Sequence, residues 1–290
     1  MTAMRIGIRT SAGGSAKIPQ SPFLLGIADS SAGFMFRGDA GAARGIRKRY
    51  GDFSGGRKPV FLFEVNFKDR KQNPYKPAIN LKNGSVRLKR GDFDCIVDTG
   101  TGAGRLEINP SQQSFDSFLR TLYSWILIRC GGCMLHSAGI VKNGKAYIFL
   151  GKSGAGKSTL SKLAAASSGC PAGRPALGIE VLSDEINLLR FEKGSFRVYG
   201  SPFWGEMRNE GRHGSWPVGG FFLLKKAKAN RLGDCTKSEA LRLLLRCLVN
   251  FDRSPETAGN VLRTAARLLA NARFSRLEFT KKDAGFLELV

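Results

Sequence analysis

The segment that most constrains this chain is the octapeptide at positions 151–158, which reads GKSGAGKS. The apolar run AYIFL precedes it and predicts a buried strand, and TLSKLAAA follows and predicts a helix. The pattern G-x-x-x-x-G-K-[ST] between a strand and a helix is typical of a phosphate-binding loop, because its glycines let backbone amides turn toward an anion at the helix N-terminus. We call residues 151–158 the phosphate loop.

The phosphate loop predicts a ligand as well as a local structure. ATP, another nucleoside triphosphate or pyrophosphate would bind together with Mg²⁺. Lys157 would reach the terminal phosphates and the Ser158 hydroxyl would coordinate the metal. The predicted binding residues are Gly151, Ser153, Gly154, Ala155, Gly156, Lys157, Ser158 and Thr159.

Composition indicates a globular chain with a core. Its 290 residues are 42% hydrophobic, enough for one large domain or two modest ones. No run approaches the ~20 apolar residues of a membrane span, and positions 1–20 lack the apolar run of a signal peptide. The sequence therefore predicts a cytoplasmic protein without a membrane span.

The formal net charge of +23 predicts an attraction to polyanions. The basic residues are spread along the chain, and only positions 47–49 form a tight cluster. No nucleic-acid-binding module is recognisable, so we expect no specific nucleic-acid partner. An acidic protein or peptide is the partner that this charge favours.

The six cysteines are scattered and do not resemble a disulfide framework. Cys130 and Cys133 form a C-x-x-C and, with His136, can be drawn as half of a zinc site. No second ligand pair lies at the usual spacing. The alternative is a pair of small, partly buried thiols near a helix end.

Two regions are predicted, a β-rich one over 1–112 and a nucleotide-binding one over 113–290. Short β-branched or aromatic runs bounded by turn residues predict the strands of the first region: 5–9, 33–37, 60–67, 77–82, 85–89 and 93–98. Asn83-Gly84 predicts a tight turn. Two Gly-rich segments, 11–17 and 38–56, are expected to be flexible.

The second region begins with a predicted connecting helix at 114–128, where apolar residues fall at helical spacing. Asn143-Gly144 between 134–141 and 146–150 predicts a β-hairpin, so the strand that feeds the phosphate loop has an antiparallel partner and the sheet is mixed. The remaining predictions are a connection at 167–178, strands at 179–182, 187–192, 195–199, 219–224 and 274–279, and helices at 238–249 and 255–270.

Three runs together resemble a known family: LHSAGIV at 135–141, the phosphate loop, and LSDE at 182–185. They resemble the catalytic domain of HPr kinase/phosphorylase and are most similar to the HPr-kinase-related proteins, whose fold is similar to that of phosphoenolpyruvate carboxykinase. The resemblance implies an α/β fold in which a mixed-sheet P-loop kinase core follows a smaller β-rich region. It also implies ATP- and Mg²⁺-dependent phosphoryl transfer to a serine hydroxyl of a protein or peptide, and a homo-oligomer.

We call Asp184 and Glu185 the acidic pair. Asp184 ends a predicted strand near the loop, where its carboxylate can activate an acceptor hydroxyl or hold Mg²⁺. Glu185 is expected to assist at the metal, which gives Ser158, Asp184 and Glu185 as metal residues. His136 matches the family's histidine near the transferred phosphate and joins Asp184 and Lys157 as a catalytic candidate. The alternative for His136 is a half-buried hairpin residue that donates to a backbone carbonyl.

A Gly-rich segment downstream carries Arg208, Arg212 and His213. Its guanidinium groups can close over phosphates, or the segment can be a solvated basic turn. Glu206 is a candidate second carboxylate of the site.

The chain departs from the family at several positions. Thr159 replaces an acidic residue, Asp-Glu replaces Asp-Asp, and residues 205–208 are a rough counterpart of a Glu-Ile-Arg-Gly-like stretch. These departures leave open a nucleotide-binding regulatory or adaptor protein without turnover. The net charge alone leaves open a second alternative, an ATPase linked to nucleic acid or transport.

Overall fold

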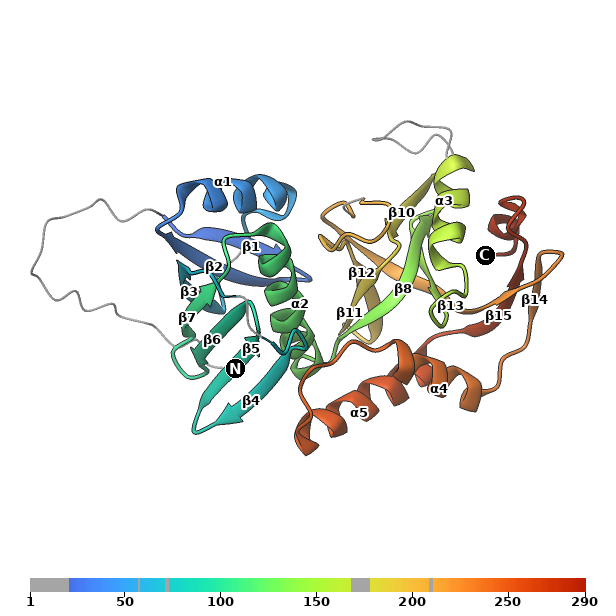
Figure 1. Cartoon of the computed structure of the whole chain (residues 1–290). Coiled ribbons are helices and arrows are strands. Elements are labelled where there is room, and N and C mark those ends of the chain that lie inside the picture. Colours follow the sequence, from blue (N-terminus) through green and yellow to red (C-terminus); the bar gives the residue numbers. More distant parts are fainter. Residues whose placement is uncertain (1–20, 57, 71–72, 168–177, 209–210) are drawn as a thin grey trace, which may run out of the picture. The chain divides into compact units, whose positions relative to one another are not determined.

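The computed structural model describes residues 21–56, 58–70, 73–167, 178–208 and 211–290. The chain divides into two compact units between Phe115 and Asp116, with Ile27–Asp29 counted in the second unit (Figure 1). The strand predicted at 5–9 and the flexible segment predicted at 11–17 lie outside the described residues, as does most of the connection at 167–178.

The first unit is built on a seven-stranded sheet in the order β1-β2-β3-β7-β6-β5-β4. Strands β2, β3 and β7 run parallel, and the pairs from β7 to β4 are antiparallel. Its elements are β1 (Phe23–Ile27), β2 (Ser30–Arg37), α1 (Ala40–Arg49), the 3-10 turn η1 (Gly51–Phe53), β3 (Phe61–Phe67), β4 (Ala78–Lys82), β5 (Ser85–Arg90), β6 (Phe93–Asp98) and β7 (Ala103–Ile108).

One face of this sheet is the core of the first unit. Alternate side chains on its strands are fully buried, among them Phe34, Phe63 and Leu106. Phe115 packs edge-on against Phe34, with 5.1 Å between ring centroids. The alternation leaves the opposite set of side chains on the other face of the sheet.

The prediction of a flexible segment over 38–56 is wrong, because its central part forms α1. The Asp39 side chain accepts a hydrogen bond of 2.9 Å from the Ala42 amide and caps the helix. Ile46 and Tyr50 are fully buried, and the Arg47 guanidinium lies 5.5 Å from the Phe36 ring centroid. These tertiary contacts outweigh the low helix propensity of the glycines.

The second unit contains most of the helices. Its elements are α2 (Gln112–Arg129, whose first turn belongs to the first unit), β8 (Cys133–Lys142), β9 (Lys145–Leu150), α3 (Lys157–Ser167), β10 (Ile179–Ser183), β11 (Ile186–Glu192), β12 (Ser195–Tyr199), β13 (Ser215–Lys226), β14 (Arg231–Gly233), α4 (Lys237–Cys247), α5 (Pro255–Asn271), β15 (Phe274–Phe279) and the 3-10 turn η2 (Gly285–Leu289).

Strand β8 organises the second sheet because it pairs with β9, β10 and β11. The β8–β9 hairpin turns at Asn143 and Gly144, both with positive φ, as the sequence predicts. Strand β13 then runs parallel to β9 and to β15, and antiparallel to β12. The prediction of a mixed sheet is confirmed, and β13 is longer than the strand predicted at 219–224.

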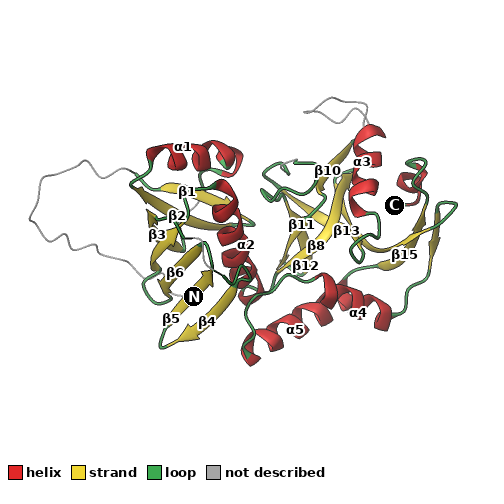
Figure 2. Cartoon of the chain, viewed as in Figure 1, coloured by secondary structure: helices red, strands yellow, loops and turns green. Residues whose placement is uncertain are grey.

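Helices cover both faces of this sheet (Figure 2). On one face Leu160 of α3 belongs to a buried cluster with Phe149 and Phe279. On the other face Leu244 of α4 and Leu268 of α5 pack with residues that include Leu150. Neighbouring positions 149 and 150 of β9 therefore enter opposite cores, which explains why this run is apolar without alternation.

The described residues form a mixed α/β protein with two mixed sheets and five α-helices. Helices are predicted at 114–128, 238–249 and 255–270, and the structure has α2, α4 and α5 there. Among the described residues, no helix combines the length and the apolar character needed to cross a membrane.

The cap of α1 predicts a specific loss of stability. Replacing Asp39 by alanine removes the acceptor for the Ala42 amide and should lower the free energy of unfolding by about 1 kcal/mol. Urea unfolding of the purified chain measures this loss. Asp52→Ala is the matched control, because Asp52 is an exposed carboxylate in η1 that caps no helix. Equal losses for both variants would contradict the capping role.

Candidate functional site

The phosphate loop connects β9 to α3, as its pattern predicts. Gly154 and Gly156 have φ values of +76° and +104°, in the region that glycine adopts readily. A Cβ atom at Gly156 would also lie 2.6 Å from the Phe279 ring, and one at Gly151 would lie 2.6 Å from the Ala155 Cβ. The loop therefore needs glycine at 156 for conformation and for space.

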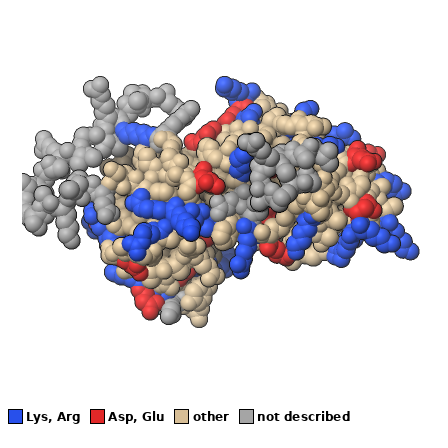
Figure 3. Space-filling view, turned by 90° about the horizontal axis from the view of Figure 1, so that it is seen from above, with Lys and Arg blue, Asp and Glu red and all other residues tan. Residues whose placement is uncertain are grey.

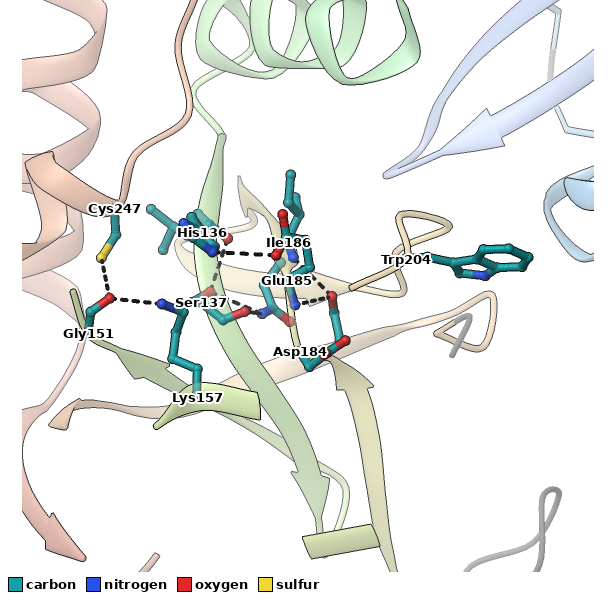
Figure 4. A network of polar contacts seen from close by, with 12 residues as sticks. His136, Ser137, Gly151, Lys157, Asp184, Glu185, Ile186, Trp204 and Cys247 are labelled. Carbon is teal, nitrogen blue, oxygen red and sulfur yellow. Dashed lines mark hydrogen bonds and ion pairs between the residues drawn. The ribbon is translucent and has the colours of Figure 1, made fainter. Parts of the chain in front are cut away.

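Lys157 turns its ammonium group back to the start of its own loop. The Lys157 Nζ donates a 3.0 Å hydrogen bond to the Gly151 carbonyl, and the residue is 7% exposed. The Cys247 thiol approaches the same carbonyl at 3.9 Å, and burial raises the pKa of this thiol (Figure 4). The outer residues of the loop, from Lys152 to Gly154, are exposed. The cation therefore sits beneath a loop whose tip is accessible.

The acidic pair lies in a gap between β10 and β11. Both strands pair antiparallel with the same edge of β8, so that Ser183 lies opposite Gly139 and Ile186 lies opposite His136. The Ser183 hydroxyl accepts hydrogen bonds from the amides of both Glu185 and Ile186. This turn of the backbone interrupts the regular ladder at the acidic pair, where the Glu185 carbonyl still accepts a hydrogen bond from β8.

The phosphate loop and the acidic pair flank the same stretch of β8. On one edge of β8, Leu150 at the end of β9 lies opposite Ser137. On the other edge, the Ser137 amide donates to the Glu185 carbonyl. Figure 4 shows Ser137 between Lys157 and Asp184. Strand β8 therefore brings together two motifs that are more than twenty residues apart in the sequence.

Asp184 is almost completely covered. It is 3% exposed, and its Oδ2 accepts a 3.1 Å hydrogen bond from the Met207 amide. Its Oδ1 is buried and has no hydrogen-bond partner among the described residues. A Cβ atom at Gly205 would lie 2.3 Å from Oδ1, so the backbone there rests directly on the carboxylate. A buried oxygen without a donor is costly, and its chemistry suits a cation or an incoming hydroxyl.

Glu185 has a different environment from that of Asp184. Its Oε2 lies 3.4 Å from His136 Nε2, and its Oε1 lies 3.3 Å from an Arg120 guanidinium nitrogen. The hydrogen bond from His136, aided by the charge of Arg120, holds the pKa of Glu185 below its usual range. Arg120 is itself bound by Asp116 at 2.6 Å and by the Trp204 carbonyl at 2.9 Å.

Asn187 of β11 and Ser137 of β8 form a buried polar pair close to the phosphate loop. The Asn187 amide donates to the carbonyl and to the hydroxyl of Ser137 at 2.8 and 3.0 Å. Its Oδ1 is buried without a partner among the described residues, and a Cβ atom at Gly139 would lie 2.1 Å from it. Ser137, Asn187 and Arg120 are not among the site residues predicted from the sequence, although an asparagine at the start of an apolar strand is an available signal.

The Gly-rich segment that carries Arg208, Arg212 and His213 does not bring these side chains together over the phosphate loop. Arg212 pairs with Glu180 at 3.3 Å and lies over the Trp216 ring. Glu206 pairs with Lys162 of α3 at 3.6 Å, although both side chains are largely exposed. Arg208 is exposed and has a φ of +48°, and His213 is also exposed.

The C-x-x-C does not form part of a metal cluster. Cys130 is exposed, whereas burial raises the pKa of the Cys133 thiol to about 12. Over the described ranges of the chain, no group of three or more His, Cys, Asp or Glu side chains could hold a metal ion. Cys133 is in fact a member of the buried apolar cluster under α4 and α5.

Charged side chains of both signs lie on the face drawn in Figure 3. Figure 3 shows Lys and Arg over both units of the face in view, with acidic side chains between them. The face in view therefore carries side chains of both signs of charge. No protein-family model matches the chain, and a search of curated proteins finds no match either.

The pairing of Glu185 predicts a pH-dependent stability. Because the folded protein lowers its pKa, the charged form stabilises the fold above roughly pH 4, and this contribution disappears as the pH falls through the folded value. Glu185→Gln should therefore lower the melting temperature at pH 7, by an amount equivalent to about 1 kcal/mol or less, and the difference from the wild type should be smaller at pH 3. Circular dichroism melts measure both. Glu288→Gln is the control, and a constant difference at the two pH values would refute the assignment.

The close approach of the Gly205 backbone to Asp184 predicts that substitutions at these two positions have non-additive effects on stability. Gly205→Ala should destabilise the protein by about 1–3 kcal/mol, because the new methyl group meets Oδ1. In an Asp184→Ala background the methyl group has room, so the same change should cost at least roughly 1 kcal/mol less. A double-mutant cycle by urea unfolding measures the difference. Additive losses would show that the backbone at 205 does not rest on the carboxylate.

Proposed function

We propose that this protein is an ATP- and Mg²⁺-dependent kinase of the HPr-kinase-related type, with a mixed-sheet P-loop kinase core. It transfers a phosphoryl group to a hydroxyl, most simply a serine hydroxyl, of a protein or peptide. The observation that supports this most is the placement of a phosphate loop and a buried, half-satisfied aspartate on the two edges of one short stretch of β8.

Phosphoryl transfer depends on positioning and charge stabilisation more than on covalent chemistry. The exposed loop tip offers backbone amides to the phosphates. The ammonium group of Lys157, which bonds to the Gly151 carbonyl, has only to rotate about its side chain to reach a bound phosphate. The low exposure of Lys157 strengthens its electrostatic effect because little water screens it.

Asp184 is the residue whose chemistry fits a metal or a general base. Its unpartnered, buried Oδ1 is an anionic oxygen, the type of ligand that Mg²⁺ prefers, and Ser158 at the start of α3 would be the second protein ligand. When bound, Mg²⁺ neutralises charge on the phosphates. Asp184 itself can accept the proton of the acceptor hydroxyl once the backbone at Gly205 moves away from it.

Glu185 and His136 work as a pair in this proposal. Both oxygens of Glu185 are occupied, one by His136 and the other by Arg120, so Glu185 is better suited to orient the imidazole than to bind the metal directly. Arg120 is a positioning residue because it links Glu185 to the Trp204 carbonyl, next to the backbone that covers Asp184.

The nature of the acceptor follows from charge and from the resemblance. A protein with a formal net charge of +23 attracts acidic partners, so an acidic protein or peptide that carries the serine is the proposed substrate. The resemblance to the HPr-kinase-related proteins adds a homo-oligomeric assembly to the proposal, and the composition of the chain adds a cytoplasmic location.

Transfer of label from γ-labelled ATP to a library of serine-containing acidic peptides tests the function. Lys157→Ala should reduce transfer on the order of a hundredfold or more, because it removes the positive charge that would stabilise the reacting phosphates. Asp184→Asn should also abolish transfer but should leave ATP binding measurable by calorimetry, since the loop is intact.

Lys152→Ala is the matched control. Lys152 lies in the same loop but is exposed at its tip, so its loss should change transfer only slightly. Transfer by the Lys157 and Asp184 variants at the wild-type rate would refute these roles, and a lack of any calorimetric response to magnesium nucleotides would refute the proposal as a whole.

One observation favours a second candidate, a nucleotide-binding regulatory protein without turnover. Asp184 is 3% exposed under the backbone at Gly205 and Met207, an arrangement that denies it to an acceptor. This candidate predicts that ATP raises the melting temperature while no peptide is labelled. Labelling of any peptide at a rate that depends on Asp184 decides against it.

A further inference from the structure

The open face of the sheet in the first unit contains a hollow of about 670 Å³. It is lined by side chains of β2, β3, β5, β6 and β7, all within the first unit. This volume lies within the range of roughly 300–1,000 Å³ that is typical of small-molecule sites. The hollow belongs to a different sheet from the phosphate loop, so the proposed kinase site does not account for it.

Small side chains create the depth of the hollow. Ala103 of β7 lies opposite Leu62 of β3, and both line the hollow together with Ser85. Two residues further along the same strands, Glu64 of β3 lies opposite Arg105 of β7, and Ile96 of β6 lies on the other side of Arg105. The long side chains of Glu64, Arg105 and Ile96 therefore stand beside the shorter side chain of Ala103, and this difference in length forms the hollow.

The carboxylates of the hollow are already satisfied. Each accepts at least one hydrogen bond or ion pair from a neighbour in the first unit. Arg87 binds Asp94 through two nitrogens, at 2.8 and 2.6 Å. The partners of the other three are Arg70 for Glu107 at 2.8 Å, Arg37 for Glu64 at 3.4 Å, and Thr101 for Asp98 at 2.7 Å.

Arg105 is the exception among the charged residues of the hollow. Its guanidinium group is exposed and makes no hydrogen bond or ion pair with any residue in the described part of the chain. Glu64 lies directly opposite on β3 but pairs with Arg37 instead. Beside Arg105 the apolar side chain of Ile96 is 50% exposed. The hollow therefore offers one unpaired cation next to an exposed aliphatic surface.

We propose that this hollow binds a small amphipathic carboxylate, whose anionic end pairs with Arg105 and whose apolar body covers Ile96, Leu62 and Met35. A guanidinium group presents a planar pair of donors that matches a carboxylate. The other arginine of the lining, Arg87, is engaged by Asp94, so the described residues of the hollow offer no second unpaired cation, which favours a monoanion over a polyphosphate. The apolar body removes from water the aliphatic surface that the sheet exposes.

The test uses 3-phenylpropionate as the probe and 3-phenylpropan-1-ol as its neutral counterpart. Titration of the ¹⁵N-labelled chain should give saturable amide shifts on β3, β6 and β7 with the acid, and binding at least tenfold weaker with the alcohol. Arg105→Leu should weaken binding of the acid at least tenfold. Ile96→Thr, which keeps Arg105 and the fold of an exposed strand position, should also weaken it.

Arg44→Leu is the control for charge, because Arg44 is exposed on α1 and does not line the hollow. This variant and Lys157→Ala should bind the probe as the wild type does, whether or not the chain is a kinase. Equal affinity for the alcohol, undiminished binding by Arg105→Leu and Ile96→Thr, or shifts spread over the basic surface would each overturn the proposal.

Discussion

The pairing of β8 along both of its edges is the constraint on which the candidate site depends. One edge holds β9 and so fixes where the phosphate loop begins, while the other holds β10 and β11 and fixes where the acidic pair leaves the ladder. A slip of one residue in either pairing would turn every side chain of that strand to the opposite face. Opposite apolar clusters on the two faces, represented by Phe149 and Leu150, oppose such a slip.

Two buried polar atoms near β8 have no hydrogen-bond partner among the described residues. The Oδ1 atoms of Asp184 and Asn187 are both buried without a partner among the described residues, and glycines at 205 and 139 approach them closely. Folding alone would favour their removal, because a buried polar atom without a partner reduces stability. The backbone that covers Asp184 at Gly205 is a loop, whereas Gly139 belongs to β8, so Asp184 is the one of the two whose unmet bonding capacity suits the chemistry we propose.

The sequence predicted the local parts of the site better than their surroundings. The phosphate loop, the β8–β9 hairpin and the gap after Ser183 all carry short-range signals, namely glycines, Asn143-Gly144 and a serine at a turn. It did not predict Arg120, which reaches Glu185 across 65 positions of sequence, or helix α1, whose stability comes from tertiary contacts rather than propensity. The cover over Asp184 was also missed, because a glycine in a loop gives no indication of what it will rest on.

The contact between Gly156 and Phe279 ties the phosphate loop to a strand near the far end of the sequence. The aromatic ring that limits the phosphate loop belongs to β15, which is parallel to β13 and enters the sheet from the far end of the sequence. A ribosome-bound chain that has completed α3 but not β15 lacks that wall. Affinity for the nucleotide that we propose as ligand should therefore arise late in synthesis, after the whole second sheet has assembled.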